Sequence, residues 1–251
     1  MNHPVWIALA WQDIKLRYRG SILGPLWITI SMAIMITIMG VIYGNLLNIE
    51  ERDYIPFFSI GLIIWTLVST TINEATITFT QNESLIKQIK IPPIIYIYRN
   101  IFKNIIIFIH NIVIIIGVVL IFDLEITLES LIQFFFGFLI VILNLVNFSK
   151  IVSFLATKYR DIQQIIHNIM QITFFSSPII WYPEIIINRG SYEWILTINP
   201  IYYFLKITRD VLMGGEISMN QWIIVSVITI VNFIMGLIVY SWGKNKMIYW
   251  L

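Results

Sequence analysis

Long apolar stretches dominate the chain and alternate with shorter polar segments. A helix that crosses the hydrocarbon core of a bilayer needs about 20 mostly apolar residues. Six stretches meet this length or come close to it: residues 26–47, 57–79, 105–122, 131–156, 162–181 and 222–242. The pattern therefore predicts an all-α integral membrane protein, with six transmembrane helices in a single transmembrane domain that covers residues 1–251.

Composition supports a lipid environment. Hydrophobic residues make up 58% of the chain and charged residues only 12%, about half the charge of a typical soluble domain. There is no cysteine, so disulfide bonds are excluded. The net charge of +2 decides little, whereas its distribution along the chain decides the expected orientation.

Basic residues gather in one set of the segments between the predicted spans. This set carries Lys15, Arg17, Arg19, Lys87, Lys90, Arg99, Lys103, Lys158, Arg160, Lys244 and Lys246. The other set is mainly acidic. Lys and Arg are enriched on the cytoplasmic side of membrane proteins. Six spans with both termini in the cytoplasm are consistent with this bias.

Residues 1–25 precede the first span and mix apolar with charged side chains. Pro4 suits the first position of a helix, and the segment predicts an amphipathic interface helix with Trp6 and Trp11 at headgroup level. The alternative is a simple anchor on anionic lipid, to which Lys and Arg are attracted in either case. The order of charged and apolar residues does not fit a cleavable signal peptide.

Residues 81–99 form the longest loop on the basic side. Asn82 can cap a short helix that runs through Lys90, and Pro92–Pro93 ends it. The apolar residues Leu85, Ile86 and Ile89 fall at helical spacing. Such a helix beneath the membrane can be gripped by a cytoplasmic partner, or it can rest on lipid.

Residues 183–213, between the fifth and sixth predicted spans, are too apolar for free solvent. Their apolar runs, 194–198 and 201–207, are also too short to span. They predict re-entrant or interfacial helices on the non-cytoplasmic side, with Asn199–Pro200 as the turn between them.

Four ionisable residues fall inside predicted spans: Glu74, His110, Lys150 and His167. Each lies about six residues from the cytoplasmic end of its span, or roughly 9 Å. Intramembrane ionisable groups are costly and tend to face protein or water. We expect one polar layer at the entrance of a path, in which Glu74 is paired. The alternative is that each group reaches the interface separately, which is easy for Lys150.

Several short motifs occur in a fixed order along the chain. They are Asp13, Arg17–Tyr18–Arg19, Leu23–Gly24–Pro25–Leu26–Trp27, Tyr159–Arg160–Asp161–Ile162, Ser177–Pro178–Ile179–Ile180, Asn199–Pro200 and Arg209. Together with the topology, this series resembles the membrane subunit of the type-2 ABC exporters for O-antigen, capsule and teichoic-acid polymers. The resemblance covers nearly the whole chain.

The resemblance implies a permease in the bacterial cytoplasmic (inner) membrane that exports a lipid-linked polysaccharide, most readily O-antigen. It implies two copies of this chain and two separate ABC ATPase subunits, with neither nucleic acid nor a metal site. The chain lacks the phosphate-binding GxxxxGK[ST] loop, so we expect the partner subunit to bind ATP and Mg²⁺ and this chain to be no enzyme and to hold no cofactor. By the same resemblance, residues 183–213 are gate helices. The expected contacts with the ATPase subunit are Leu85, Lys87, Gln88, Ile89, Arg160 and Asp161.

A sugar path requires aromatic faces that stack on sugar C–H groups and polar groups that exchange hydrogen bonds with hydroxyls. Aromatic residues make up 15% of the chain. Many of them lie at predicted interfaces, where belt anchoring is the usual role. The candidates for the path are Trp65, Phe174, Phe175, Tyr202 and Tyr203, although packing is the common role of any single one.

Three other functions remain open at this stage. A type-2 ABC exporter of a drug or lipid predicts a narrower and more apolar path. A membrane enzyme acting on lipid-linked sugars would use paired acidic or histidine groups, for which Asp161 and His167 are the candidates. Asp161 beside Arg160 suits an ion pair or a helix start instead. A secondary transporter would place ion sites at the midplane, whereas the ionisable groups here lie nearer one surface.

Overall fold

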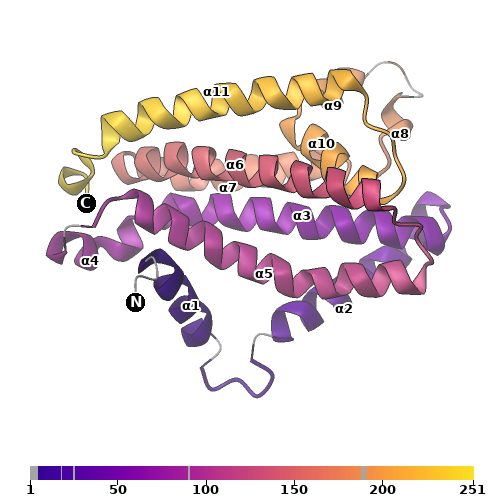
Figure 1. Cartoon of the computed structure of the whole chain (residues 1–251), viewed down its shortest axis with the longest axis horizontal. Helices are drawn as coiled ribbons and strands as arrows, with labels where there is room; N and C mark the ends of the chain where they lie inside the picture. The colour runs from indigo at the N-terminus through magenta and orange to yellow at the C-terminus, as the bar shows by residue number, and fades with distance from the viewer. Residues whose placement is uncertain (1–4, 18, 25, 90, 188–189, 191) are drawn as a thin grey trace.

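A computed structural model describes residues 5–17, 19–24, 26–89, 91–187, 190 and 192–251. These residues form helices and loops without a strand, and the long helices lie side by side in one bundle (Figure 1). Five of the described helices are long and apolar enough to cross a membrane. They are α2 (Leu26–Leu47), α3 (Glu51–Ile77), α5 (Ile94–Ile121), α6 (Leu128–Lys158) and α11 (Met219–Gly243).

Helix α7 (Asp161–Ser176) is shorter than the fifth predicted span, residues 162–181. Its 16 residues correspond to about 24 Å, against a hydrocarbon core of about 30 Å. The helix ends where Pro178 follows, because proline disfavours the helical conformation of the residue before it. Ser177 is accordingly extended, and the chain continues through buried Pro178 and Ile179.

Two helices begin well before their apolar stretches predict, α3 by six residues and α5 by eleven. Helix α3 starts at Glu51 rather than at residue 57, with two acidic residues in its first turn, where they complement the positive end of the helix dipole. Helix α5 starts at Ile94 rather than at residue 105. Its first turns carry Arg99 and Lys103, which interrupt the apolar pattern without interrupting the helix.

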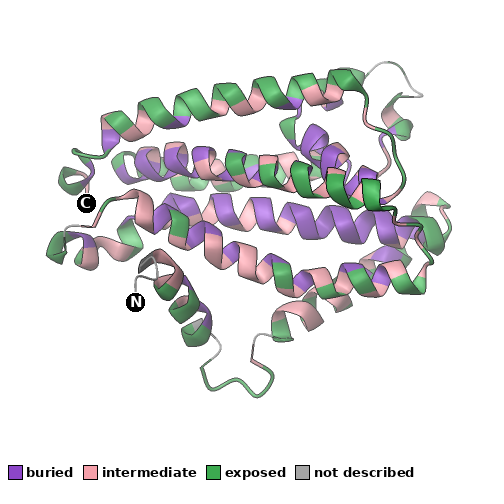
Figure 2. Ribbon diagram, in the orientation of Figure 1, coloured by how far each residue is buried: buried purple, intermediate pink, exposed green. Residues whose placement is uncertain are grey.

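Helix α3 forms the centre of the bundle (Figure 2). In its most apolar stretch 78% of the residues are buried, compared with 11% in the corresponding stretches of α2 and α11. It packs against α2, α5, α6 and α7, which explains why its side chains are buried around most of its circumference. The peripheral helices expose apolar side chains such as Leu120 and Ile230, as expected for surfaces that face lipid.

The bundle has two distinct ends. The α4 end carries α4 (Glu83–Gln88), η1 (Thr80–Asn82), η3 (Met247–Tyr249) and the C-terminus. The opposite end, the α8 end, carries α8 (Glu184–Ile187) and the loops after α2 and α5 (Figure 1). Helix α1 (Val5–Arg17) packs along α5. Residue Pro4, predicted to start this helix, lies outside the described residues.

The described residues between 183 and 213 form short helices near the α8 end: α8, α9 (Glu193–Ile198), α10 (Pro200–Leu205) and the π-helix η2 (Lys206–Asp210). Asn199 caps α10, because its side chain accepts a hydrogen bond from the backbone N–H of Ile201 at 2.9 Å. Helix η2 packs against α3 and α6, and α10 packs against α11. We call residues 199–213, which lie within the region expected to hold gate helices, the gate segment.

Candidate transport path and coupling region

A cavity of about 270 Å³ lies between α2, α3 and α7. The rings of Trp65 and Phe174 meet in it, with centroids 5.7 Å apart. The cavity combines these aromatic faces with hydroxyl, amide and imidazole groups. Its lining residues are Met35, Leu62, Trp65, Thr66, Ser69, Asn73, His167, Met170, Gln171 and Phe174.

Helix α7 carries a polar stripe that continues outward from this cavity. Gln164, His167, Asn168 and Gln171 are all exposed in the described chain. Their spacing of three and four residues places them on one face of the helix, and the Gln164 amide donates to Asn168 at 3.0 Å. Three of these four residues are amides. The sequence-based prediction considers ionisable groups within the spans, so it includes His167 but not the three amide residues.

The predicted path residues divide into two groups in the structure. Trp65 and Phe174 share the cavity, and Phe175 follows Phe174 on α7 with 66% of its surface exposed. Tyr202 and Tyr203 are instead buried in α10, and neither belongs to the cavity lining. The Tyr203 hydroxyl donates to the backbone oxygen of Thr197 at 3.2 Å, which holds α10 against the end of α9.

The four ionisable residues predicted to share one layer lie on four different helices. The Glu74 carboxylate forms an ion pair with the Lys103 ammonium at 2.9 Å and accepts a hydrogen bond from the Asn104 amide at 2.7 Å. Lys150 donates to the Asn147 side chain at 2.9 Å. His110 Nδ1 lies 2.8 Å from the backbone oxygen of Ile106 in its own helix, and His167 faces the cavity. Glu74 is therefore paired, while a common layer stays a prediction.

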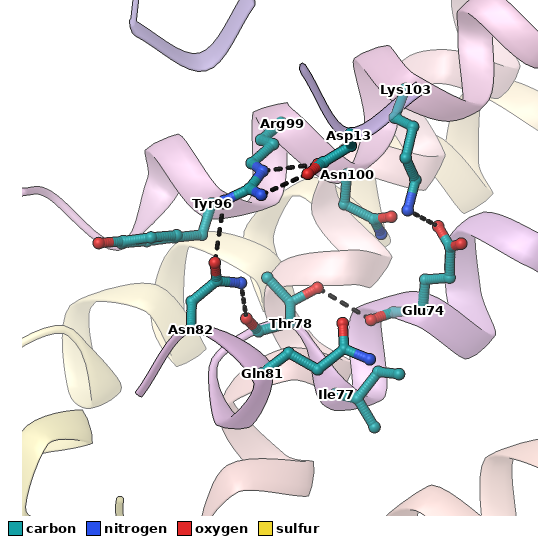
Figure 3. A pocket seen from close by; sticks show the side chains of 10 residues that line it. All are labelled: Asp13, Glu74, Ile77, Thr78, Gln81, Asn82, Tyr96, Arg99, Asn100 and Lys103. Atoms are coloured by element: carbon teal, nitrogen blue, oxygen red, sulfur yellow. Dashed lines mark hydrogen bonds and ion pairs between the residues drawn. The ribbon is translucent and has the colours of Figure 1, made fainter. Parts of the chain in front are cut away.

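A second cavity of about 550 Å³ is lined by residues of α1, α3, η1 and α5 (Figure 3). Arg99 grips the Asp13 carboxylate with two nitrogens, at 2.7 and 2.5 Å, and donates to Asn82 at 2.9 Å. The Asn82 amide in turn donates to the backbone oxygen of Thr78 at 2.7 Å. These bonds occupy both ends of the Asn82 side chain. The prediction that Asn82 caps α4 is therefore wrong, and α4 is also shorter than predicted.

The gate segment is anchored by a fully buried cation. Arg209 lies over the face of Phe57 at 3.7 Å from the ring centroid, donates to the backbone oxygen of Pro178, and pairs with Asp210 at 2.7 Å. A Cβ atom at Gly61 would lie 3.4 Å from this side chain, at the near limit of ordinary van der Waals contact. Arg209 joins the gate segment to α3 and to the break after α7.

Tyr182 covers the same junction from outside. Its ring stacks on Phe57 with centroids 4.0 Å apart, and its hydroxyl donates to the backbone oxygen of Asp53 at 3.1 Å. Burial, followed by the nearby Asp53 carboxylate, raises the pKa of Tyr182 to about 12. The phenol is therefore protonated at neutral pH and available as a donor.

The residues predicted to meet an ATPase subunit lie at the α4 end. Lys87, Gln88 and Ile89 are exposed on or just after α4, while Leu85 is half-buried. Lys87 forms an exposed ion pair with Glu83, one helical turn away. Arg160 and Asp161 are exposed where α7 begins. Nothing in these positions conflicts with a contact surface, whose occupant stays a prediction.

Comparison with known proteins assigns the class. The chain matches the ABC-2 type transporter family over residues 4–213, so it belongs to this family of ABC transporter membrane subunits. It is a multi-pass membrane permease and not an enzyme, which excludes the alternative built on Asp161 and His167. The motif series indicates this family correctly.

Two relatives of the chain are named as O-antigen export permeases. The chain is 23% identical to an O-antigen export system permease protein RfbA of Klebsiella pneumoniae over 239 residues, covering 94% of this chain and 90% of the relative. It is 22% identical to the protein of the same name from Myxococcus xanthus over 203 residues, covering 78% of this chain and 75% of the relative.

Proposed function

We propose that this chain is the permease subunit of an ABC exporter that moves a lipid-linked polysaccharide of the O-antigen class across the cytoplasmic membrane. The polar stripe of α7 beside the aromatic cavity carries this proposal. Amide side chains are costly in contact with lipid tails. Gln164, Asn168 and Gln171 therefore require water, protein or a polar cargo along the outer face of α7.

The chemistry of the stripe and cavity suits a polyhydroxylated chain. Aromatic faces at Trp65 and Phe174 can stack on sugars, while amides and hydroxyls exchange hydrogen bonds with them. Gln171 lies ten residues after the start of α7, or about 15 Å along the helix, which is half the thickness of the hydrocarbon core. A polar surface of this depth favours a polysaccharide over an apolar drug or lipid.

The proposed topology places the α4 end in the cytoplasm and counts α7 as a sixth span, completed by the extended chain after Ser177. Because the polar stripe of α7 lies on the outer face of the subunit, one subunit cannot enclose a polymer that binds it. We therefore propose a homodimer in which two α7 stripes face one conduit around a two-fold axis. The gate segment, held by Arg209, lies at its outer mouth.

The proposed energy source is a pair of ABC ATPase subunits that bind ATP and Mg²⁺ and contact α4 and residues 160–161. ATP binding there would favour one arrangement of the spans over another, because the bound subunit contacts the two arrangements differently. Helix α1, through the bidentate Asp13–Arg99 pair, would follow the motion of α5.

The test uses cells that make a lipid-linked O-antigen but lack their export permease. They receive this chain with a co-expressed O-antigen ATPase subunit, and surface polymer is measured. We expect export by the wild type and a several-fold loss for Phe174→Leu and Gln171→Leu. The matched control is Phe135→Leu, since Phe135 is 58% exposed on α6 and lies outside the cavity lining.

Two results would decide against the proposal. Export that tolerates Phe174→Leu and Gln171→Leu as well as Phe135→Leu would remove the assigned path. A complex that hydrolyses ATP, exports no polymer and carries an apolar dye or lipid instead would support the drug or lipid exporter.

A further inference from the structure

The last residues of the chain fold back onto the α4 end of the bundle. Met247, which begins η3, is only 2% exposed. It belongs to a hydrophobic cluster, distinct from the main core, that includes Phe79 in the turn between α3 and η1, Ile86 of α4 and Phe154 of α6. Figure 1 shows the C-terminal turn beside the ends of these helices.

A second contact ties the same turn to the end of α6. The ammonium of Lys158, the last residue of α6, lies 4.8 Å from the ring centroid of Tyr159, 4.7 Å from that of Trp242 and 5.7 Å from that of Trp250. Trp242 and Trp250 also pack together, with centroids 4.8 Å apart. Each such cation–aromatic contact is attractive within about 6 Å.

The two contacts reach two separate surfaces at the α4 end. Through the cluster, Met247 shares its packing with Ile86 of α4. Through the aromatic cage, Trp250 holds Lys158, which directly precedes Tyr159 and the start of α7. Helix α4 has only six residues, too few to be stable as an isolated helix. Its position therefore depends on the cluster beneath it.

We infer that residues 247–251 form a positioning element that locks α4 and the turn at residues 158–161 into one rigid unit. This rests on the proposed function, in which these two surfaces receive the motion of the ATPase subunits. Met247 and Trp250 need not touch the partner. They act through α4 and Lys158, so that movement of the partner is transmitted to the spans instead of being absorbed by the loop.

The first experiment needs no ATPase subunit. Hydrogen exchange is measured on the full chain in lipid nanodiscs, comparing Met247→Ser with Ile248→Ser. Ile248 is 52% exposed, so it provides the same substitution one residue away. We expect Met247→Ser to accelerate exchange of the α4 amides by about tenfold or more, with rescue by Met247→Leu. Unchanged exchange in α4 would overturn the inference.

The second experiment measures polymer exported per ATP hydrolysed in the reconstituted complex. Trp250→Ala should retain the ATPase subunit and its hydrolysis while export falls several-fold, and Trp250→Phe should restore it. The control is Tyr249→Ala, since Tyr249 is 86% exposed. Equal behaviour of the two alanine variants would refute the coupling role. A wild-type chain that binds no ATPase subunit would refute the proposed function. The hydrogen-exchange experiment needs no such subunit, so it would still test whether residues 247–251 hold α4 in place.

Discussion

Gly137 marks a close approach between α6 and the gate segment, and its replacement by alanine tests the packing directly. A Cβ atom at this position would lie far inside contact distance of the Ile207 backbone oxygen, and only 3.0 Å from the carbonyl carbon. A carbon and a carbonyl oxygen in contact are about 3.3 Å apart. The backbone of η2 would therefore retreat by roughly 1 Å.

That retreat is expensive because backbone, unlike a flexible side chain, cannot rotate away. Overpacking of this kind destabilises by about 1–3 kcal/mol, and here it also shifts the turn that carries Arg209. We expect Gly137→Ala to lower the thermal midpoint in detergent by several degrees and to reduce export through a displaced gate segment.

Gly117→Ala provides the matched control. No heavy atom lies within 4 Å of a Cβ atom at Gly117 in α5, and alanine favours a helix over glycine by about 1 kcal/mol. This variant should be neutral or slightly stabilised. If Gly137→Ala melts at the same temperature as Gly117→Ala, the close approach of η2 to α6 is not present in the membrane protein.

Three further outcomes follow from the ion pairs. Arg209→Met should destabilise the chain by about 3 kcal/mol in thermal unfolding, because removal of the buried cation leaves the Pro178 carbonyl and the Asp210 carboxylate without their partner. Stability equal to wild type would contradict the anchoring role. Glu74→Leu strands Lys103, which is partly exposed, so we expect a smaller loss of roughly 1–2 kcal/mol and reduced export, whereas Glu74→Leu with Lys103→Leu should recover stability. Asp13→Asn weakens the ion pair that holds α1 to Arg99 and should accelerate hydrogen exchange in α1 but not in α11. An equal change of the exchange rate in both helices would contradict this role of the ion pair.

The sequence predicts the long helices well because apolar length is a local signal. The predicted span 26–47 and the observed α2 have the same bounds. Helix α5 shows the limit of that signal, since Arg99 and Lys103 look like loop residues until Asp13 and Glu74 are seen to pair with them. These partners lie far away in the chain, and pattern alone does not connect them.

The site shows the same division. Trp65 and Phe174 are found from residue type and span position, and the structure brings them together in one cavity. The amides of α7 are missed because their importance arises from exposure on a helix that should face lipid. The aromatic cage around Lys158 depends on the C-terminal turn folding back, for which the sequence carries no periodic signal.

The π-helical turn at Lys206–Asp210 makes the gate segment sensitive to residue count. A π-helix closes its hydrogen bonds over five residues instead of four, so it accommodates one residue more than the corresponding α-helical turn. Deleting one residue there would let the turn close as an ordinary α-helical turn, and the wider turn that now presents Arg209 would be lost. The guanidinium would leave Phe57 and turn toward another neighbour. This turn should therefore tolerate changes of side chain far better than changes of length.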